Sequence, residues 1–298
     1  MRAIYILLAT AFLMSSCEKE IAYKGKELEN FMVVNSVLLP DSLLSCRVTR
    51  SNTIFDDETI KVIGDATVEV YQDKELVEVL PYSPDGYYRS ASLKAVEGQN
   101  YSFNISHESY ETISGQTKVP TRADAIIQSA AYNENTYMYD VTLAITDLPG
   151  DDYYRLLAYV DDVIYDYDGN VIQEGYVKAF INSSDPVLNF NKVSGDESDF
   201  SDYPDNNYMV FDDALFDGET YQLRVGISYY AYGARPMRII LQHLNEDLFL
   251  YYSSVQSHIY YDEDPFAEPV QIHSNVSNGA GIWSSAAETL MEVGEENR

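Results

Sequence analysis

Hydrophobic and polar residues alternate with a period of two along most of the chain after residue 30. Short segments rich in Val, Ile, Thr and Tyr recur, and turn-forming pairs such as Pro-Asp and Gly-Asp separate them. In residues 31–120 these segments are FMVVNSVLL, LLSCRVTRS, DATVEVYQD, ELVEVLPY, GYYRSA, QNYSFNISH and TISGQTKVP. Such closely spaced short strands predict a β-sandwich of immunoglobulin-like or prealbumin-like type.

A second series of alternating segments follows residue 120, namely AIIQSAAY, YMYDVTLAITD, YYRLLAYVDD, VIQEGYVKAFI and TYQLRVGISYYAYG. In DVTLAITD the residues Val141, Leu143 and Ile145 fall on one face, as in a strand with one solvated side. We therefore expect a mainly β chain with two tandem β-sandwich domains.

The junction between these domains is predicted near residue 120, where the first series of strands pauses at Val-Pro-Thr. An N-terminal sandwich would occupy residues 31–120, and a C-terminal β-rich domain residues 121–298. Within the second domain, the acidic stretch around residues 196–207 predicts a long solvated loop.

One segment, LNEDLFLYYSSVQSHIYY, shows helical periodicity. Asn245 can cap this helix, and Glu246 and Asp247 lie in its first turn, where the helix dipole favours acidic side chains. We expect a helix near residues 246–258 that packs one face on the second sheet. Its apolar face would carry Leu244, Leu248, Tyr251 or Tyr252, Val255 and Ile259. The following DEDPFAEPVQIHSNVSNGAGIW is interrupted by proline and glycine, and it predicts an irregular segment followed by a short polar tail.

The N-terminal apolar run, Ile4 to Met14, is too short to cross a bilayer, which needs about 20 residues. It is typical of the core of a signal peptide. The following L-M-S-S-C resembles the lipobox of bacterial lipoproteins. This resemblance implies removal of residues 1–16, acylation of Cys17 and anchoring in outer-membrane lipid, with residues 17–30 as a tether. The alternative is a cleaved secretory peptide with a chance cysteine.

The charged residues after the cysteine, Glu18, Lys19 and Glu20, resemble the acidic, lysine-containing tag that directs lipoproteins of the Bacteroidota to the cell surface. This resemblance implies an outer-membrane protein that faces the outside. The alternative is a lipoprotein that faces the periplasm.

Charge and cysteine content narrow the possible partners. Residues 1–16 hold one Arg and no acidic residue, so their removal leaves 18 basic and 48 acidic side chains, a net charge of −30. Such a negative field repels nucleic acid and anionic membrane surfaces. The second cysteine, Cys46, alternates onto one face with Leu44 and Val48, which predicts a buried thiol. With Cys17 lipidated, no intramolecular disulfide is possible.

Motifs of catalysis or of tight metal binding are absent from the sequence. The histidines are too scattered for a zinc site, and no G-x-S-x-G elbow occurs. Carboxylates are so numerous that a pair at catalytic distance would be expected by chance. We therefore predict no catalysis and no resident metal or cofactor. The four histidines are His107, His243, His258 and His273. Of these, His258 and His273 flank the aromatic IYYDEDPF and are the pair to inspect for a metal or haem.

Calcium is the ion that the acidic loops could bind, because they concentrate oxygen ligands. The candidates are DYDGN at residues 166–170 and the 196–207 loop. In DYDGN the glycine is the fourth residue of the cluster, whereas a calcium-binding loop needs it sixth. Asp-Gly-Asn between two alternating segments instead predicts a hairpin turn.

Tyrosine is unusually frequent, with 27 residues, often paired or interleaved with acidic side chains. Tyrosine offers a flat apolar face and a hydroxyl, which suit stacking on sugars or peptides. Most of these residues are expected to be structural. A possible ligand surface, for a glycan or peptide, would comprise Tyr229, Tyr230, Tyr232, Tyr260, Tyr261 and Trp283.

The closing segment also carries a family resemblance. Together with the preceding acidic and aromatic helix, YYRLLAYV and GDATVEVYQD, it is similar to a Bacteroidota lipoprotein family named domain of unknown function 4249. Two departures are Asp264, where the family has Asn, and AGIW in place of LGIF. The signature residues, expected to be structural, are Pro265, Phe266, Glu268, Pro269, Ser274, Asn275, Gly279 and Gly281.

This resemblance implies an outer-membrane lipoprotein that is commonly encoded beside a TonB-dependent transporter, and it implies no established reaction. We expect an accessory binding protein that works with such a transporter on an unknown nutrient. The alternatives are a free-standing structural or adhesive surface lipoprotein, or a hydrolase without a recognisable motif.

Overall fold

The structure is a computed structural model that describes residues 29–53, 56, 59–189, 209–228, 235–261 and 268–294. The chain is mainly β, as the alternation predicts. The strands within these described ranges form one ten-stranded sheet and two four-stranded sheets. In the part of the chain that the structure describes, no helix is both long enough and apolar enough to cross a bilayer.

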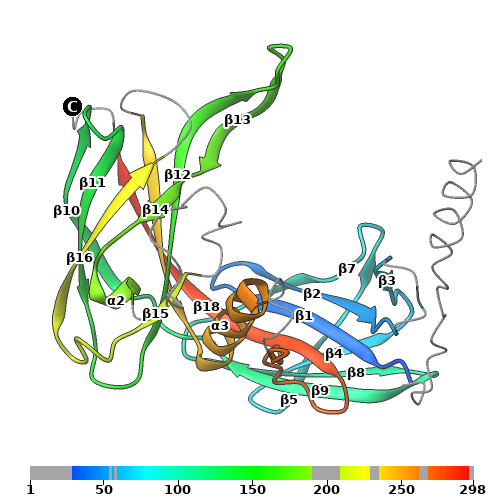
Figure 1. Ribbon diagram of the computed structural model, residues 1–298. Helices are drawn as coiled ribbons and strands as arrows, with labels where there is room; N and C mark the ends of the chain where they lie inside the picture. The colour runs from blue at the N-terminus through cyan, green and yellow to red at the C-terminus, as the bar shows by residue number, and fades with distance from the viewer. Residues whose placement is uncertain are drawn as a thin grey trace, which may run out of the picture.

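The first sandwich lies in residues 32–118 (Figure 1). Its strands are β1 (Met32–Leu38), β2 (Leu43–Arg50), β3 (Lys61–Val62), β4 (Thr67–Gln72), β5 (Glu75–Leu80), β6 (Tyr82–Ser83), β7 (Tyr87–Lys94), β8 (Asn100–His107) and β9 (Tyr110–Lys118). One layer is the four-stranded sheet β5-β4-β8-β9, and the other is the β1-β2-β7-β6 part of the large sheet. Both layers contribute to one buried core that includes Val34, Val68 and Phe103. All the segments predicted as strands here are confirmed.

The second sandwich follows the same plan, with a core that includes Leu143, Leu156 and Ile239. Its elements are β10 (Asp124–Asn133), β11 (Met138–Thr146), β12 (Tyr153–Tyr165), β13 (Val171–Lys178), β14 (Phe180–Asn182), α2 (Pro186–Asn189), β15 (Val210–Asp212), β16 (Thr220–Ser228), β17 (Met237–Leu244), α3 (Glu246–Tyr261) and β18 (Ala280–Val293). The four-stranded sheet β10-β11-β16-β14 is one layer, and the β13-β12-β17 part of the large sheet is the other.

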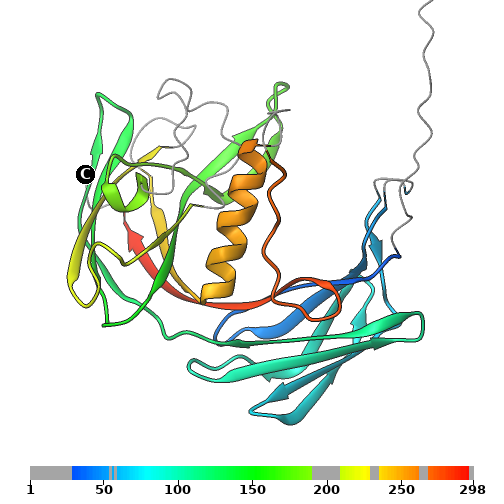
Figure 2. The ribbon, with the colours of Figure 1, turned by 60° about the horizontal axis from the view of Figure 1, so that its bottom comes forward.

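The two sandwiches share strand β18, which runs from one into the other (Figures 1 and 2). Residues 280–285 pair in parallel with β1 in the first sandwich. Residues 286–293 pair antiparallel with β17 in the second. A single ten-stranded sheet, in the order β13-β12-β17-β18-β1-β2-β7-β6, therefore serves both cores.

This shared strand corrects the sequence analysis in two ways. The prediction of a short polar tail after residue 283 is wrong, because the chain continues in a central strand to Val293. The assignment of the whole closing segment to the second domain is also wrong, since Trp283 belongs to the core of the first. Residues 282–287 are all buried, so no polar and apolar alternation marks this strand in the sequence.

Where strands have one wet face, the predicted inward residues are confirmed. Leu44, Cys46 and Val48 are at most 1 % exposed, and the Cys46 thiol is free and buried. The hairpin predicted at DYDGN joins β12 to β13. Its turn is closed by a hydrogen bond from the Asp166 amide to the Asn170 carbonyl, with Gly169 at a φ of 84°.

Helix α3 begins after Asn245, whose Oδ1 accepts a hydrogen bond from the Leu248 amide at 3.3 Å, as predicted for its cap. The helix lies on the large sheet, against β18, β15 and β12 (Figure 2). Leu248 packs in a small core with Leu244 and Ala286. Leu248 is its one buried residue, and Ile259, predicted on the packed face, is 41 % exposed. The helix is thus anchored by its first turns.

Candidate functional site

Several predicted sites lie outside the residues that the structure describes. They are the lipidation and export residues Cys17, Glu18, Lys19 and Glu20, the signature residues Pro265 and Phe266, the tyrosines Tyr229, Tyr230 and Tyr232, and the 196–207 loop. The roles assigned to these residues therefore stay predictions. The described candidates are the closing segment, the histidines, the remaining aromatic residues and the acidic side chains.

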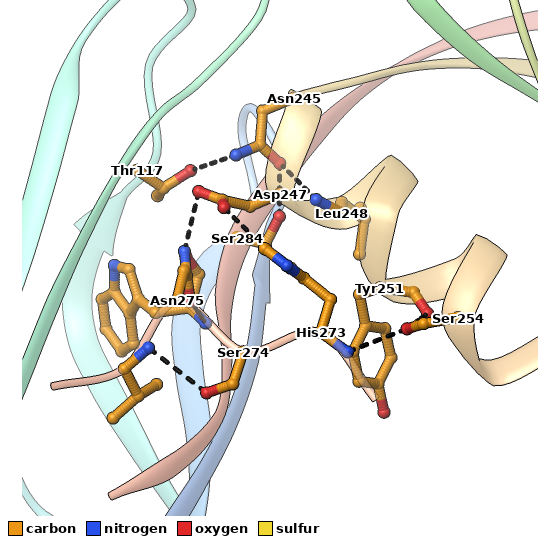
Figure 3. Close-up of polar contacts among 12 residues, drawn as sticks. Thr117, Asn245, Asp247, Leu248, Tyr251, Ser254, His273, Ser274, Asn275 and Ser284 are labelled. Carbon is orange, nitrogen blue, oxygen red and sulfur yellow. Dashed lines mark hydrogen bonds and ion pairs between the residues drawn. The ribbon is translucent and has the colours of Figure 1, made fainter. Parts of the chain in front are cut away.

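In the closing segment, Asn275 clamps the start of β18 (Figure 3). Its Oδ1 accepts the Trp283 amide at 2.9 Å, and its Nδ2 donates to the Trp283 carbonyl at 2.8 Å. The same Nδ2 lies 3.0 Å from Oδ2 of Asp247 in the first turn of α3. The side chain of Ser274 accepts a long bond from the Val276 amide, and Glu268 and Pro269 are exposed. Asn275 therefore acts as a structural link between helix and strand.

The two signature glycines allow β18 to approach the first sandwich closely. At Gly281, φ is 110°, a conformation that side chains rarely adopt. A Cβ there would lie 1.9 Å from the Val34 carbonyl oxygen. A Cβ at Gly279 would lie 2.6 Å from the carbonyl oxygen of Met32. These contacts fit the structural role expected of the signature.

A buried polar network joins β9, β18 and the cap of α3 (Figure 3). Asn245 Nδ2 donates to the Thr117 hydroxyl at 3.2 Å, and its Oδ1 accepts the Ser284 hydroxyl. Thr117 is in turn 2.9 Å from the hydroxyl of Ser285, which donates to the Lys118 carbonyl at 2.8 Å. The network gives hydrogen-bond partners to the hydroxyls of Ser284 and Ser285, both of which are fully buried.

Each of three histidines faces an aspartate of its own, so the structure does not gather them. His107 Nε2 is 3.1 Å from Asp65, and His243 Nε2 is 2.9 Å from Asp152. His273 Nε2 is 2.9 Å from Asp247, and its amide donates to the Ser254 hydroxyl. Among the described residues, no group of three potential metal ligands includes a histidine. The suggestion of a site at His258 and His273 stays a prediction.

The predicted aromatic ligand surface needs one correction. Trp283 is fully buried, and its ring centroid lies 4.6 Å from that of Phe103 in the first core, with the two rings tilted by 37°. It cannot contact a ligand at the surface, because the first half of β18 points this side chain inward. Tyr260 is 37 % exposed and lies at the C-terminal end of α3. Its ring centroid is 5.0 Å from that of Tyr261, in an edge-on arrangement. Trp283 and this tyrosine pair therefore do not form one patch.

In the calcium candidate at residues 166–170, the carboxylate oxygens of Asp166 already accept hydrogen bonds from other groups of the same turn. Oδ1 of Asp166 accepts the amides of Asp168 and Asn170, and Oδ2 accepts the Asn170 side-chain amide at 2.8 Å. These bonds hold the pKa of Asp166 below its usual value, with the Asn170 side chain as the largest cause. The geometry is that of a hairpin turn stabilised by an aspartate side chain.

An acidic cluster that the sequence analysis missed lies at one end of the second sandwich. Asp147 follows β11, Asp152 precedes β12 and Asp213 follows β15, and one ligand oxygen from each lies within 4.8 Å of the others. Asp147 accepts the Tyr154 hydroxyl and, at 2.8 Å, the Gly218 amide. The signal that could have found this cluster is an aspartate directly next to a strand terminus. Among 48 acidic residues, this signal is not specific.

Burial and mutual repulsion set the electrostatics of this cluster. Asp147 is 4 % exposed and Asp213 is 5 % exposed. Burial, together with the nearby negative charges of Asp147 and Asp152, raises the pKa of Asp213 to about 6. Burial and the hydrogen bond to Asp147 raise the pKa of Tyr154 far above its usual value, so its hydroxyl remains a donor. Such an arrangement of oxygen ligands can hold a cation.

Comparison with known proteins supports the resemblance noted in the closing segment. The family described as Domain of unknown function (DUF4249) matches residues 18–291, which include both sandwiches and most of the shared strand. No curated protein shows a significant match. Because the match covers most of the chain, this protein belongs to the family Domain of unknown function (DUF4249).

Proposed function

We propose that this protein is a lipid-anchored accessory binding protein of the outer membrane that works with a TonB-dependent nutrient transporter. The observation that carries the proposal is Cys17, placed directly after a short apolar run and two serines. Acyl chains on this cysteine would hold the chain at a membrane although the signal peptide, residues 1–16, is removed. The transporter is proposed as the partner because the family that the chain resembles is commonly encoded beside a TonB-dependent transporter.

The position of the fold relative to this anchor supports a role close to the membrane. Residues 17–30 separate the acylated cysteine from the first strand, and this length of chain spans at most about 50 Å when fully extended. The first sandwich would therefore stay close to the lipid surface. Strand β18 belongs to both sandwiches, so the second sandwich would be held near the membrane together with the first.

A binding role, rather than a catalytic one, agrees with how the histidine side chains are used. His273 and Asp247 hold the closing segment to α3, and His243 bonds the Thr121 carbonyl and Asp152. These groups stabilise contacts between distant segments. The proposed ligand is a nutrient such as a glycan or peptide, for which exposed tyrosines are the stacking groups.

The hairpin between β12 and β13 is the first surface to examine for a protein contact. It extends past the end of the neighbouring strands (Figure 1). Tyr167 at its turn is fully exposed, and Val171 and Ile172 are 54 % and 66 % exposed. Exposed apolar side chains gathered on a projecting element are typical of interaction sites.

The test is chemical crosslinking of outer membranes, affinity purification of the lipidated chain, and mass spectrometry of the partners. We expect stoichiometric recovery of a TonB-dependent transporter, and loss of that recovery when Tyr167 and Ile172 are both changed to Ser. A matched control changes Ile126, which is 59 % exposed on β10, to Ser. Recovery of the protein alone would refute the transporter partnership and favour a free-standing adhesive or structural protein.

The surface orientation is tested separately on intact cells. We expect externally added proteinase K to digest the wild-type protein. Changing Glu18 and Glu20 to Ala should protect it, if these residues form the export tag. Protection of the wild-type chain itself would instead place the protein on the periplasmic side.

A further inference from the structure

Three chain segments converge on the acidic cluster at one end of the second sandwich. The Asp147 amide donates to the Glu219 carbonyl at 3.2 Å, which joins the end of β11 to the start of β16. The Asp213 amide donates to the Asp152 carbonyl at 3.2 Å, which joins the end of β15 to the start of β12. The second bond brings Asp213 beside the connection that carries both Asp147 and Asp152, although Asp213 lies far from them in the sequence.

One carboxylate oxygen in this cluster has no hydrogen-bond partner. Oδ2 of Asp213 is buried and unpaired, and the residue as a whole is 5 % exposed. An unsatisfied charged oxygen in the interior is energetically costly, and native proteins rarely retain one without a ligand. A high content of acidic residues does not by itself leave a carboxylate oxygen unpaired. At Asp166, for example, both oxygens accept hydrogen bonds.

Among the described residues, one basic side chain, His243, forms an ion pair with this cluster. Its Nε2 lies 2.9 Å from Asp152, and its Nδ1 lies 2.8 Å from the Thr121 carbonyl oxygen. Both neighbours are acceptors, so this ring can bring at most one positive charge against three carboxylates. Among the ion pairs of the described residues, none joins a Lys or Arg to Asp147 or Asp213. Carboxylates at this separation repel one another strongly where water is excluded.

We propose that Asp147, Asp152 and Asp213 bind a calcium ion, which ties the connection between β11 and β12 to the turn that follows β15. Calcium is bound by oxygen ligands at about 2.3–2.6 Å, so two oxygens on one ion lie at most about 5 Å apart. The separation of up to 4.8 Å fits this limit. An all-carboxylate set suits a hard cation, whereas zinc prefers nitrogen and sulfur ligands. This proposal does not depend on the proposed function.

The test is calorimetric titration of the full lipidated chain in detergent, stripped of metal with a chelator, using calcium chloride. Potassium chloride at about 0.15 M screens diffuse attraction to the acidic surface. We expect one saturable site with a Kd of about 10⁻⁵–10⁻³ M. At 100-fold excess of calcium over Kd, we expect the melting temperature to rise by about 5 °C.

The variant Asp213→Asn should weaken calcium binding at least tenfold, and it should raise the melting temperature of the metal-free protein because it removes a buried charge. The matched control is Asp168→Asn, which deletes the same charge at the exposed hairpin turn and should leave calcium binding unchanged. Equal calcium binding by Asp213→Asn and the wild type would overturn the proposal, as would the absence of a saturable site.

A second measurement does not depend on any variant. Tyr154 donates its hydroxyl to Asp147, so terbium bound at the cluster would be excited through this ring. We expect terbium luminescence on excitation of tyrosine, and its displacement by calcium but not by equimolar potassium. Luminescence that calcium does not displace would contradict a calcium site.

Discussion

The substitution Gly281→Ala tests whether the closing segment holds the two sandwiches together. Gly281 lies at the start of β18, where the strand pairs in parallel with β1. Its φ of 110° belongs to a region that an alanine avoids, and the added Cβ would lie 1.9 Å from the Val34 carbonyl oxygen. Both effects destabilise the folded state, so the substitution is expected to separate β18 from β1.

The magnitude follows from these two effects. Backbone strain at a positive φ costs about 1–3 kcal/mol for a residue with a side chain. Atoms forced into a packed region cost about 1–3 kcal/mol more, and here the conflicting atom belongs to the backbone of a central strand. The free energy of unfolding should therefore fall by about 4 kcal/mol.

Two other glycines provide matched controls that separate these effects. Gly98 has a φ of 77° but open space around the position of a Cβ, so Gly98→Ala should cost about 1–2 kcal/mol from strain alone. Gly294 has neither a positive φ nor a neighbour within 4 Å, so Gly294→Ala should change stability by less than about 0.5 kcal/mol.

The assay is urea unfolding followed by tryptophan fluorescence, with circular dichroism as a second probe. Trp283 is the one tryptophan of the chain and lies two residues from the substitution, so its emission reports on the first core directly. With a slope of about 3 kcal/mol per molar urea, the midpoint should fall by roughly 1 M for Gly281→Ala. A loss no larger than that of Gly98→Ala would refute the close approach of β18 to β1.

Three further predictions concern single side chains. Trp283→Ala should lower the free energy of unfolding by about 3–5 kcal/mol, measured by urea titration with circular dichroism, because it empties a fully buried site. Tyr260→Ala, at a partly exposed residue, should cost far less, and equal losses would place Trp283 outside the core. Burial raises the pKa of the Cys46 thiol to about 12, so at pH 8 a thiol reagent should modify Cys46 only after urea unfolds the lipidated protein. Rapid modification of the native state would contradict that burial. Cys17→Ser should abolish labelling by radioactive palmitate and move the protein out of the membrane fraction, and a labelled variant would refute the lipidation site.

Much of the fold could be predicted from sequence, because most strands have one buried and one solvated face. The alternation in LLSCRVTR and DVTLAITD correctly assigned Cys46 and Leu143 to the interior. Local chemistry likewise predicted the Asn245 cap and the hairpin turn at Asp166, since both depend on neighbouring residues. The family resemblance was recognisable for a related reason, because each of its motifs is a short contiguous stretch of chain.

The acidic cluster and the role of the signature glycines could not be predicted in the same way. Asp147 and Asp213 are ordinary members of a large set of acidic residues until the backbone brings their oxygens within 4.8 Å. Similarly, Gly281 reads as a loop breaker in the sequence. Its close approach to Val34 exists only because the two strands pair, although they lie at opposite ends of the chain.

The sequence by itself determined the class of fold, the inward faces of the half-buried strands, the helix start and the lipobox-like segment before Cys17, all of which depend on residues close together in the chain. Tertiary structure decided the place of β18, the burial of Trp283 and the convergence of the three aspartates. The physical reason is that a strand buried on both faces loses the alternation that reveals strands at the surface. Its partners are selected by packing between distant segments, which no local pattern records.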